Sequence, residues 1–455
     1  MKQFDFTLSM PLPEDIEKRK WAGDLKGAVE AIDRRLAQAL PAALADRLTL
    51  EREIILRLPT QYPYNREQAL KKMQDAIPGF TAEELDELDL DGKVDYIYLN
   101  GQKRYFVRFH ATLLKTPALL ARAGEITSSG SAWLDPLIER IQNEGKLTAH
   151  VNIASSLYAT DKAFIPCEAY RAHLPIPAKA PQTSDIKIAF GGYQPKHIDA
   201  ETAPQRTAFF EETLGRNKPF TAEYSYTQTI CYADLTAPAP AAPLYPDAPP
   251  PAEADLAEEG ACIRFTPYLK QLCAEIIAGL ETPVDKVRAI YDFVTQRVTY
   301  AFVRDYFQIP HLGEYAAINL RGDCGIQALL FINLCRIAKI PARWQSGLVI
   351  AQDYIGSHDW AQFYLDGWGW LFADCSFGGG ANRVGNENRR QFYFGNLEPL
   401  RIVFNSAYEK PFETPKRFPR YDPYDNQTGE LECAQKGFNG RETDCDLTLV
   451  NLIYD

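Results

Sequence analysis

One short stretch of the chain reads Arg321-Gly322-Asp323-Cys324-Gly325-Ile326-Gln327-Ala328-Leu329-Leu330, and it has the pattern of a loop that turns into a helix. Asp323 suits the N-cap position of this helix, and Pro341 marks its end. Cys324 therefore lies in the first turn, where the helix dipole and unpaired N–H groups favour a thiolate. The helix itself is predicted from apolar residues at helical spacing, namely Ile326, Leu329, Leu330, Leu334 and Ile337.

Two residues downstream complete a candidate catalytic triad. His358 precedes a strand-like run, and Asp374 follows a second run after the hairpin-type turn Asp366-Gly367. Neighbouring strands lie about 4.8 Å apart, so we expect Asp374 to hydrogen-bond to His358 and to orient its ring. Cys324 would be the nucleophile, and backbone N–H groups at the helix start would form an oxyanion hole.

Several residues near the triad have a structural interpretation beside a functional one. Asp359 is a rival orienter, but in a strand it points to the face opposite His358. Cys335, further along the same helix, is interpreted as a core residue, which is the usual role of an isolated cysteine. Three residues are candidates for substrate or oxyanion contacts: Trp360, which suits a core position equally well, and Tyr300 and Asn319, for which a turn-capping role is favoured.

Four motifs surround these residues: Gly322-Asp323-Cys324-Gly325, Leu334-Cys335-Arg336, His358-Asp359-Trp360 and Gly369-Trp370-Leu371-Phe372-Ala373-Asp374. Together they resemble the transglutaminase-like superfamily, which has a papain-like Cys-His-Asp site. The resemblance covers about residues 260–405. Members often have Gly before the Ile340-Pro341-Ala342-Arg343 block, whereas this chain has Lys339, so a left-handed cap there would cost roughly 1 kcal/mol.

This resemblance implies an α+β fold in which a helix bearing Cys324 packs on an antiparallel sheet bearing His358 and Asp374. It also implies acyl transfer from a peptide or glutamine amide through a thioester, without a metal or an organic cofactor. Water as the acyl acceptor gives a protease or amidase, which we favour; a lysine amine gives protein cross-linking. A peptide- or glycan-binding scaffold without turnover is a further alternative.

Composition agrees with a multidomain enzyme of the cytoplasm. A chain of 455 residues exceeds the usual single-core limit of about 250–300. A net charge of −11 without a long basic run argues against nucleic acid and anionic membranes as partners. The N-terminus lacks the pattern of a signal peptide, and nine cysteines without a Cys-x-x-Cys pair favour a reducing compartment over disulfides or zinc. The oligomeric state is left open.

The predicted organisation has five parts. Residues 1–180 form a mixed region, helical from Pro13 to about Ala82 and with a hairpin at Asn100-Gly101. Residues 181–235 form a small β-rich module with a helical excursion over 206–214, and 236–259 form an exposed Pro/Ala-rich linker. The catalytic domain spans 260–405, and 406–455 form a wrapping tail with little regular structure.

Overall fold

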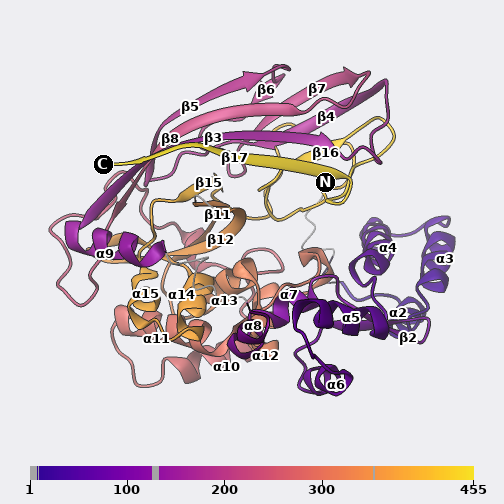
Figure 1. Ribbon diagram of the computed structural model, residues 1–455, viewed down its shortest axis with the longest axis horizontal. Coiled ribbons are helices and arrows are strands. Elements are labelled where there is room, and N and C mark those ends of the chain that lie inside the picture. Colours follow the sequence, from indigo (N-terminus) through magenta and orange to yellow (C-terminus); the bar gives the residue numbers. More distant parts are fainter. Residues whose placement is uncertain (1–7, 9, 125–132, 352–353) are drawn as a thin grey trace.

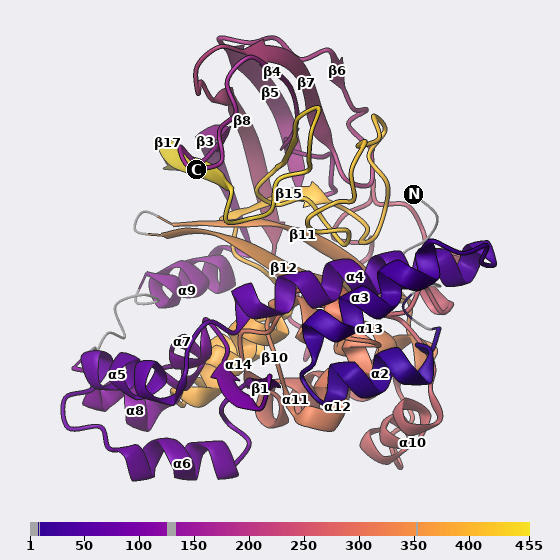
Figure 2. The same cartoon turned by 90° about the vertical axis from the view of Figure 1, so that its right-hand side faces the viewer.

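The computed structural model describes residues 8, 10–124, 133–351 and 354–455. A β-sandwich lies at the top of Figure 1, a mixed helix-and-sheet layer lies below it, and the N-terminal helices pack beside that layer (Figures 1 and 2). Within the described residues, no helix is both long and apolar enough to cross a membrane.

The N-terminal region is helical, as predicted. Its helices are amphipathic and several begin at side-chain caps, for example Asn65 and Thr81, which each form a capping box. The predicted hairpin is also present: Asn100 and Gly101 have φ of 49° and 75°, as a type I′ turn requires. The elements are α2 (Glu14–Trp21), α3 (Leu25–Leu36), α4 (Ala42–Gln61), α5 (Arg66–Ala76), α6 (Ala82–Leu90), β1 (Tyr96–Leu99), β2 (Gln102–Tyr105), α7 (Phe109–Leu113), α8 (Pro117–Arg122) and α9 (Leu134–Glu144).

A β-sandwich follows, and it includes both the middle and the end of the chain. Its two four-stranded sheets have the strand orders β17-β3-β8-β5 and β16-β4-β7-β6. Their facing side chains form one apolar core, since buried residues alternate with exposed ones along β3 and β8. The strands are β3 (Lys146–Ala159), β4 (Glu168–Pro175), β5 (Thr183–Gly191), β6 (His197–Ile198), β7 (Thr207–Leu214), β8 (Phe220–Cys231), β16 (Glu430–Glu432) and β17 (Thr443–Tyr454).

The sandwich differs from the predicted organisation in three places. The predicted boundary at 180/181 falls between β4 and β5. The side chains of both strands share one sandwich core, so no domain boundary lies there. Residues 207–214 are strand β7 rather than helix, because pairing with β4 outweighs the helical preference of their glutamates. The segment 406–455 was expected to have little regular structure, yet its strand β17 pairs with β3 along almost its whole length.

The third unit is an α+β layer built around a five-stranded antiparallel sheet of order β14-β13-β12-β11-β15. Helix α13 packs against one face of this sheet, as predicted. Its elements are α10 (Pro267–Ile276), α11 (Pro283–Arg297), β9 (Thr299–Tyr300), η3 (Tyr306–Gln308), α12 (Leu312–Asn319), β10 (Arg321–Gly322), α13 (Cys324–Ile337), β11 (Ala342–Ala351), β12 (Tyr354–Leu365), β13 (Gly369–Ala373), α14 (Cys375–Arg383), α15 (Glu387–Phe392), β14 (Phe394–Gly395) and β15 (Arg401–Asn405).

The other face of this sheet lies against the sandwich (Figure 2). Ile402 and Phe404 of β15 join the sandwich core, whereas Val403 between them joins the core of the helical side. Strand β11 is buried along almost its whole length, as expected for a strand covered on both faces. The sheet that holds the site is therefore fixed from both sides.

Most residues of the Pro/Ala-rich segment 236–259 are exposed, as we predicted, but the segment is anchored to the α+β layer at a few points. Tyr245 is buried and its ring meets Phe372 edge to face. Trp370 donates a 2.8 Å hydrogen bond from Nε1 to the carbonyl of Pro249, and the segment ends in the short helix η2 (Glu253–Leu256). The composition of this segment correctly predicted that it has no hydrophobic core of its own. It did not predict that aromatic residues would attach the segment to the α+β layer.

Candidate active site

Cys324 is the first residue of α13, as the sequence predicted, and Asp323 is the N-cap. Asp323 Oδ1 accepts a 3.2 Å hydrogen bond from the Ile326 N–H and also a hydrogen bond from the Tyr306 hydroxyl. Gly325 is required by this packing, because a Cβ there would collide with the Tyr306 hydroxyl and lie 2.9 Å from a carboxylate oxygen of Asp359. The glycine after Cys324 thus allows two side chains to approach the start of the helix.

The thiol of Cys324 contacts Asp359. Sγ donates a 3.2 Å hydrogen bond to Asp359 Oδ2, and Gln427 Nε2 donates a 2.7 Å hydrogen bond to the other oxygen. Asp359 also shares a hydrogen bond with Asp425, which accepts a 2.6 Å bond from the Ser346 hydroxyl. The expectation that Asp359 points away from His358 is met, but the thiol lies on the Asp359 side of the strand.

These neighbours oppose ionisation of the thiol in this arrangement. Burial raises the pKa of Cys324 well above the ordinary value, and the carboxyl groups of Asp359 and Asp323 raise it further. Burial likewise raises the pKa of Asp359, with the negative charges of Asp425 and Asp323 acting in the same direction. The sequence predicted a lowered thiol pKa from the helix dipole; in the structure, burial and then the neighbouring acids act in the opposite direction.

His358 and Asp374 form the predicted pair. His358 Nε2 lies 2.7 Å from Asp374 Oδ2, with both side chains buried. Asp374 is also the N-cap of α14, since its Oδ1 accepts a 2.9 Å hydrogen bond from the Phe377 N–H. The His358 ring stacks on Trp360 and contacts Phe377, so its orientation is fixed from several sides.

A buried cation supports this pair. The guanidinium of Arg401 lies 2.8 Å from Asp374 Oδ2 and 2.5 Å from Glu398 Oε1, and all three side chains are fully buried. Burial alone would raise the pKa of Asp374, but the charges of His358 and Arg401 more than offset it and lower that pKa below its usual range. Asp374 is therefore a carboxylate held ready to accept a hydrogen bond from the imidazole.

Cys324 and His358 line two adjoining pockets. Cys324 and Asp359 line one of about 510 Å³, and His358 lines a second of about 390 Å³. Four residues line both pockets and so form the wall between them: Lys115, Tyr300, Tyr354 and Ser357. Over the described residues, the thiol hydrogen-bonds to Asp359 and makes no such bond to His358. The imidazole uses Nε2 for Asp374, which leaves Nδ1 for a thiol that turns toward it.

The three further candidates from the sequence differ in their positions. Tyr300 lines both pockets, because β9 pairs with β10 and places Tyr300 opposite Gly322, two residues before Cys324. Trp360 is fully buried and donates a 2.9 Å hydrogen bond to Gln345, so it supports His358 from behind. Asn319 is exposed and donates to the carbonyl of Tyr315, and it lines neither of these two pockets.

Sequence reasoning missed the partners that come from distant segments. Arg401, Asp425 and Gln427 contact the triad region but lie well beyond the motif blocks. Arg401 had one available signal, since an arginine inside the apolar run Leu400 to Phe404 must find a carboxylate when buried. The sequence around Asp425 and Gln427 offered no comparable signal that either residue would reach the site.

Residues 270–375 match the family model described as the transglutaminase-like superfamily. This chain contains a transglutaminase-like domain. The matched segment begins inside α10 and ends one residue after Asp374, so it includes Cys324, His358 and Asp374.

Solved structures with some likeness to the chain include a candidate cysteine protease from Cytophaga hutchinsonii, with 14% identity, 68% of this chain and 90% of that chain covered, and a TM-score of 0.40. The periplasmic domain of TgpA from Pseudomonas aeruginosa has 13% identity, 57% and 96% coverage, and a TM-score of 0.29. Likenesses of this strength carry no argument about activity. No curated protein matches the chain closely enough to count as a relative.

Proposed function

We propose that this protein is a cysteine-dependent acyl-transfer enzyme that cleaves an amide in a peptide or a glutamine side chain. The observation that carries the proposal is the buried His358–Asp374 pair, 2.7 Å apart and backed by Arg401, beside a pocket with a cysteine at a helix start. A buried imidazole paired with a carboxylate that a cation keeps ionised is suited to taking up and returning a proton. The transglutaminase-like domain supports the same chemistry.

The reaction begins when Cys324 leaves Asp359 and turns toward His358 Nδ1. The thiol proton passes to the imidazole, and Sγ bonds to the amide carbonyl carbon. The C–N bond then breaks, the leaving amine takes the proton from His358, and a thioester remains. Water attacks the thioester with His358 as base, which releases a carboxylic acid and the free thiol. Asp374 holds the ring and stabilises its charged form throughout.

Hydrolysis is the favoured outcome, and transfer to a primary amine is the alternative. A screen of peptides and glutamine amides, with and without a fluorescent primary amine, separates the two. Hydrolysis releases acid whether or not amine is present, whereas transamidation incorporates the amine. Cys324→Ala should abolish either product, and Cys167→Ala, which changes an exposed cysteine, should change neither.

A scaffold without turnover is the second candidate, and one observation favours it: the thiol is bonded to a carboxyl group rather than to the imidazole. Trapping of the acyl-enzyme tests it: the protein is denatured during reaction with an amide substrate, and peptide mapping locates any thioester. A scaffold leaves Cys324 unmodified, like the exposed Cys167, and this result, together with no product from the screen, would contradict the enzyme proposal.

A further inference from the structure

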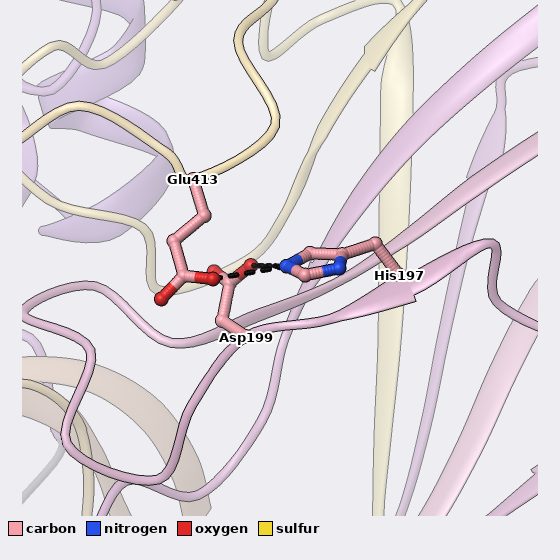
Figure 3. Close-up of side chains that lie close together, drawn as sticks. All are labelled: His197, Asp199 and Glu413. Carbon is pink, nitrogen blue, oxygen red and sulfur yellow. Dashed lines mark hydrogen bonds and ion pairs between the residues drawn. The ribbon is translucent and has the colours of Figure 1, made fainter.

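A second cluster of chemically active side chains lies far from the thiol, at the edge of the sandwich. His197 of β6, Asp199 just after it, and Glu413 from the segment that joins β15 to β16 converge there (Figure 3). His197 Nε2 lies 2.9 Å from Glu413 Oε2 and 3.4 Å from Asp199 Oδ1. The three candidate ligand atoms all lie within 4.8 Å of one another.

These separations suit the ligands of a single metal ion. Zinc binds His nitrogen and carboxylate oxygen at about 2.0–2.2 Å, which puts two ligand atoms of one ion roughly 3.0–3.5 Å apart. The two distances measured from His197 fall close to that range, although a hydrogen bond would give similar ones. The cluster therefore needs evidence from a second feature.

Asp199 provides that feature. Its side chain is only 1% exposed, and Oδ2 accepts hydrogen bonds from both the N–H and the hydroxyl of Thr207, at 2.9 and 2.7 Å. Oδ1 is buried, has no hydrogen-bond partner, and faces His197 and Glu413 (Figure 3). A buried acceptor without a partner is costly, and a cation would satisfy it. Thr207 meanwhile holds the carboxylate in one orientation, as outer-shell groups do at metal sites.

The charges at the cluster also suit a cation. Two cations lie near these residues along the chain: Arg206 donates from Nε to the backbone carbonyl of Asp199 and from Nη1 to that of Pro177, and Lys196 pairs with Glu212. The carboxylates of Asp199 and Glu413 are thus not cancelled by a directly bonded guanidinium. His197 and Glu413 are partly exposed, so the cluster is open to solvent on one side and an ion can enter.

We propose that His197, Asp199 and Glu413 bind a divalent transition-metal ion of the zinc class. Imidazole with two carboxylates is a donor set that such ions accept, with water at the remaining positions. Glu413 lies in the same segment as Asp422, Asp425 and Gln427, which line the Cys324 pocket. Metal binding joins this segment to the β6–β7 edge of the sandwich and so stabilises one wall of that pocket.

Cobalt(II) titration of the full-length protein tests the proposal, because its visible spectrum reports the ligand type. We expect one tight equivalent with the bands of nitrogen and oxygen ligands and without the near-ultraviolet absorption of cobalt–thiolate bonds, competed off by zinc. His197→Gln and Glu413→Gln change exposed groups and should each weaken this binding by at least about tenfold. The matched control is His150→Gln, since His150 is similarly exposed and pairs with Asp455 only 3.0 Å away.

Each result separates the metal site from a simple ion pair. Binding that survives in both His197→Gln and Glu413→Gln, or that is lost equally in His150→Gln, overturns the proposal. The same holds if the wild-type protein takes up cobalt only through its thiols. A melting temperature that rises with zinc in the wild type but not in Glu413→Gln supports it. These measurements need no turnover, so they stand whether or not Cys324 is catalytic.

Discussion

Asp374 and Asp359 are two buried carboxyl groups of the same site whose surroundings act in opposite directions. Asp374 lies against His358 and Arg401, which lower its pKa despite burial. Asp359 lies among acids, with Asp425 and Asp323 adding to the effect of burial, and its pKa rises. The charge of the neighbours, rather than the residue type or the degree of burial, decides which acid is ionised.

The two acids are consequently suited to different tasks. An ionised Asp374 can orient His358 and stabilise the imidazolium. Asp359 beside the thiol raises the pKa of Cys324 and accepts its hydrogen bond, so the thiol is turned away from His358. Under the proposed mechanism this is a resting arrangement, and the comparison predicts which substitutions abolish activity and which release it.

The largest effect is expected from the residues that exchange the proton. Cys324→Ala should abolish amide cleavage because the thioester cannot form. His358→Ala should lower kcat/KM by about 10⁴-fold or more, since the described residues offer no second imidazole at the site. Steady-state kinetics on an amide found by the screen measure both. Cleavage by Cys324→Ala at the wild-type rate would show that the chemistry takes place elsewhere.

The comparison itself is tested by the isosteric pair Asp374→Asn and Asp359→Asn. Asp374→Asn should lower kcat by roughly 10²–10⁴-fold, because an amide neither selects the imidazole tautomer nor stabilises its charge. Asp359→Asn should leave kcat within about tenfold of the wild type or raise it, because the group removed opposes the thiolate. If Asp359→Asn is the more damaging of the two, Asp359 takes part in the reaction and the roles assigned to the two acids are wrong.

The third prediction concerns the thiol. The pH dependence of Cys324 alkylation should have its inflection above the ordinary value of about 8.5 in the wild type and lower in Asp359→Asn. The reason is that the substitution removes the second contribution to the raised thiol pKa, after burial itself. Mass-spectrometric peptide mapping follows the rate at Cys324, with the exposed Cys167 as the internal reference. An inflection that does not move would mean that Asp359 contributes nothing and that burial and Asp323 control the thiol pKa.

The sequence predicted the local parts of this site well. The N-cap Asp323, the helix start at Cys324 and the strand–turn–strand unit from His358 to Asp374 depend on neighbours along the chain, and all are present. Lys339 has a φ of 64°, so the left-handed position after α13 exists without the glycine that the family often has there. Local propensity and capping rules capture such features because the interacting groups are close in sequence.

The parts that could not be predicted depend on distant segments. Strand β17 completes a sheet with β3, which lies in the first half of the chain, and pairing over that separation leaves no local pattern. The acid cluster also depends on segments that are distant in the sequence, because Asp425 and Gln427 reach Asp359 from the segment after β15. The helix dipole at Cys324 was visible in the sequence, whereas the carboxyl groups that oppose it were not.

The smallest predicted effect is on stability and concerns the acid cluster as a whole. Burial, and then the charge of Asp425, raise the pKa of Asp422 to about 8, and burial raises that of Asp323 to about 6. An acid whose pKa is higher in the folded state contributes stability that is complete below about pH 4 and is lost as pH rises through the folded-state value. Each unit of difference between the folded-state and unfolded-state pKa corresponds to about 1.4 kcal/mol in the free energy of unfolding.

The free energy of unfolding should therefore fall between about pH 5 and pH 8.5, and Asp422→Asn should reduce that fall by up to about 4 kcal/mol, since roughly three pH units separate pH 5 from the folded-state pKa. Asp374 should act in the opposite direction, since its lowered pKa gives stability that is lost only as pH falls below about 4. Urea denaturation at pH 5.0 and 8.5 measures the difference, with Asp446→Asn as an exposed control that hydrogen-bonds only to side chains on the sandwich surface. Equal losses of stability in the wild type and in Asp422→Asn would mean that the pKa of Asp422 is not raised in the folded protein and that this acid is already ionised at neutral pH.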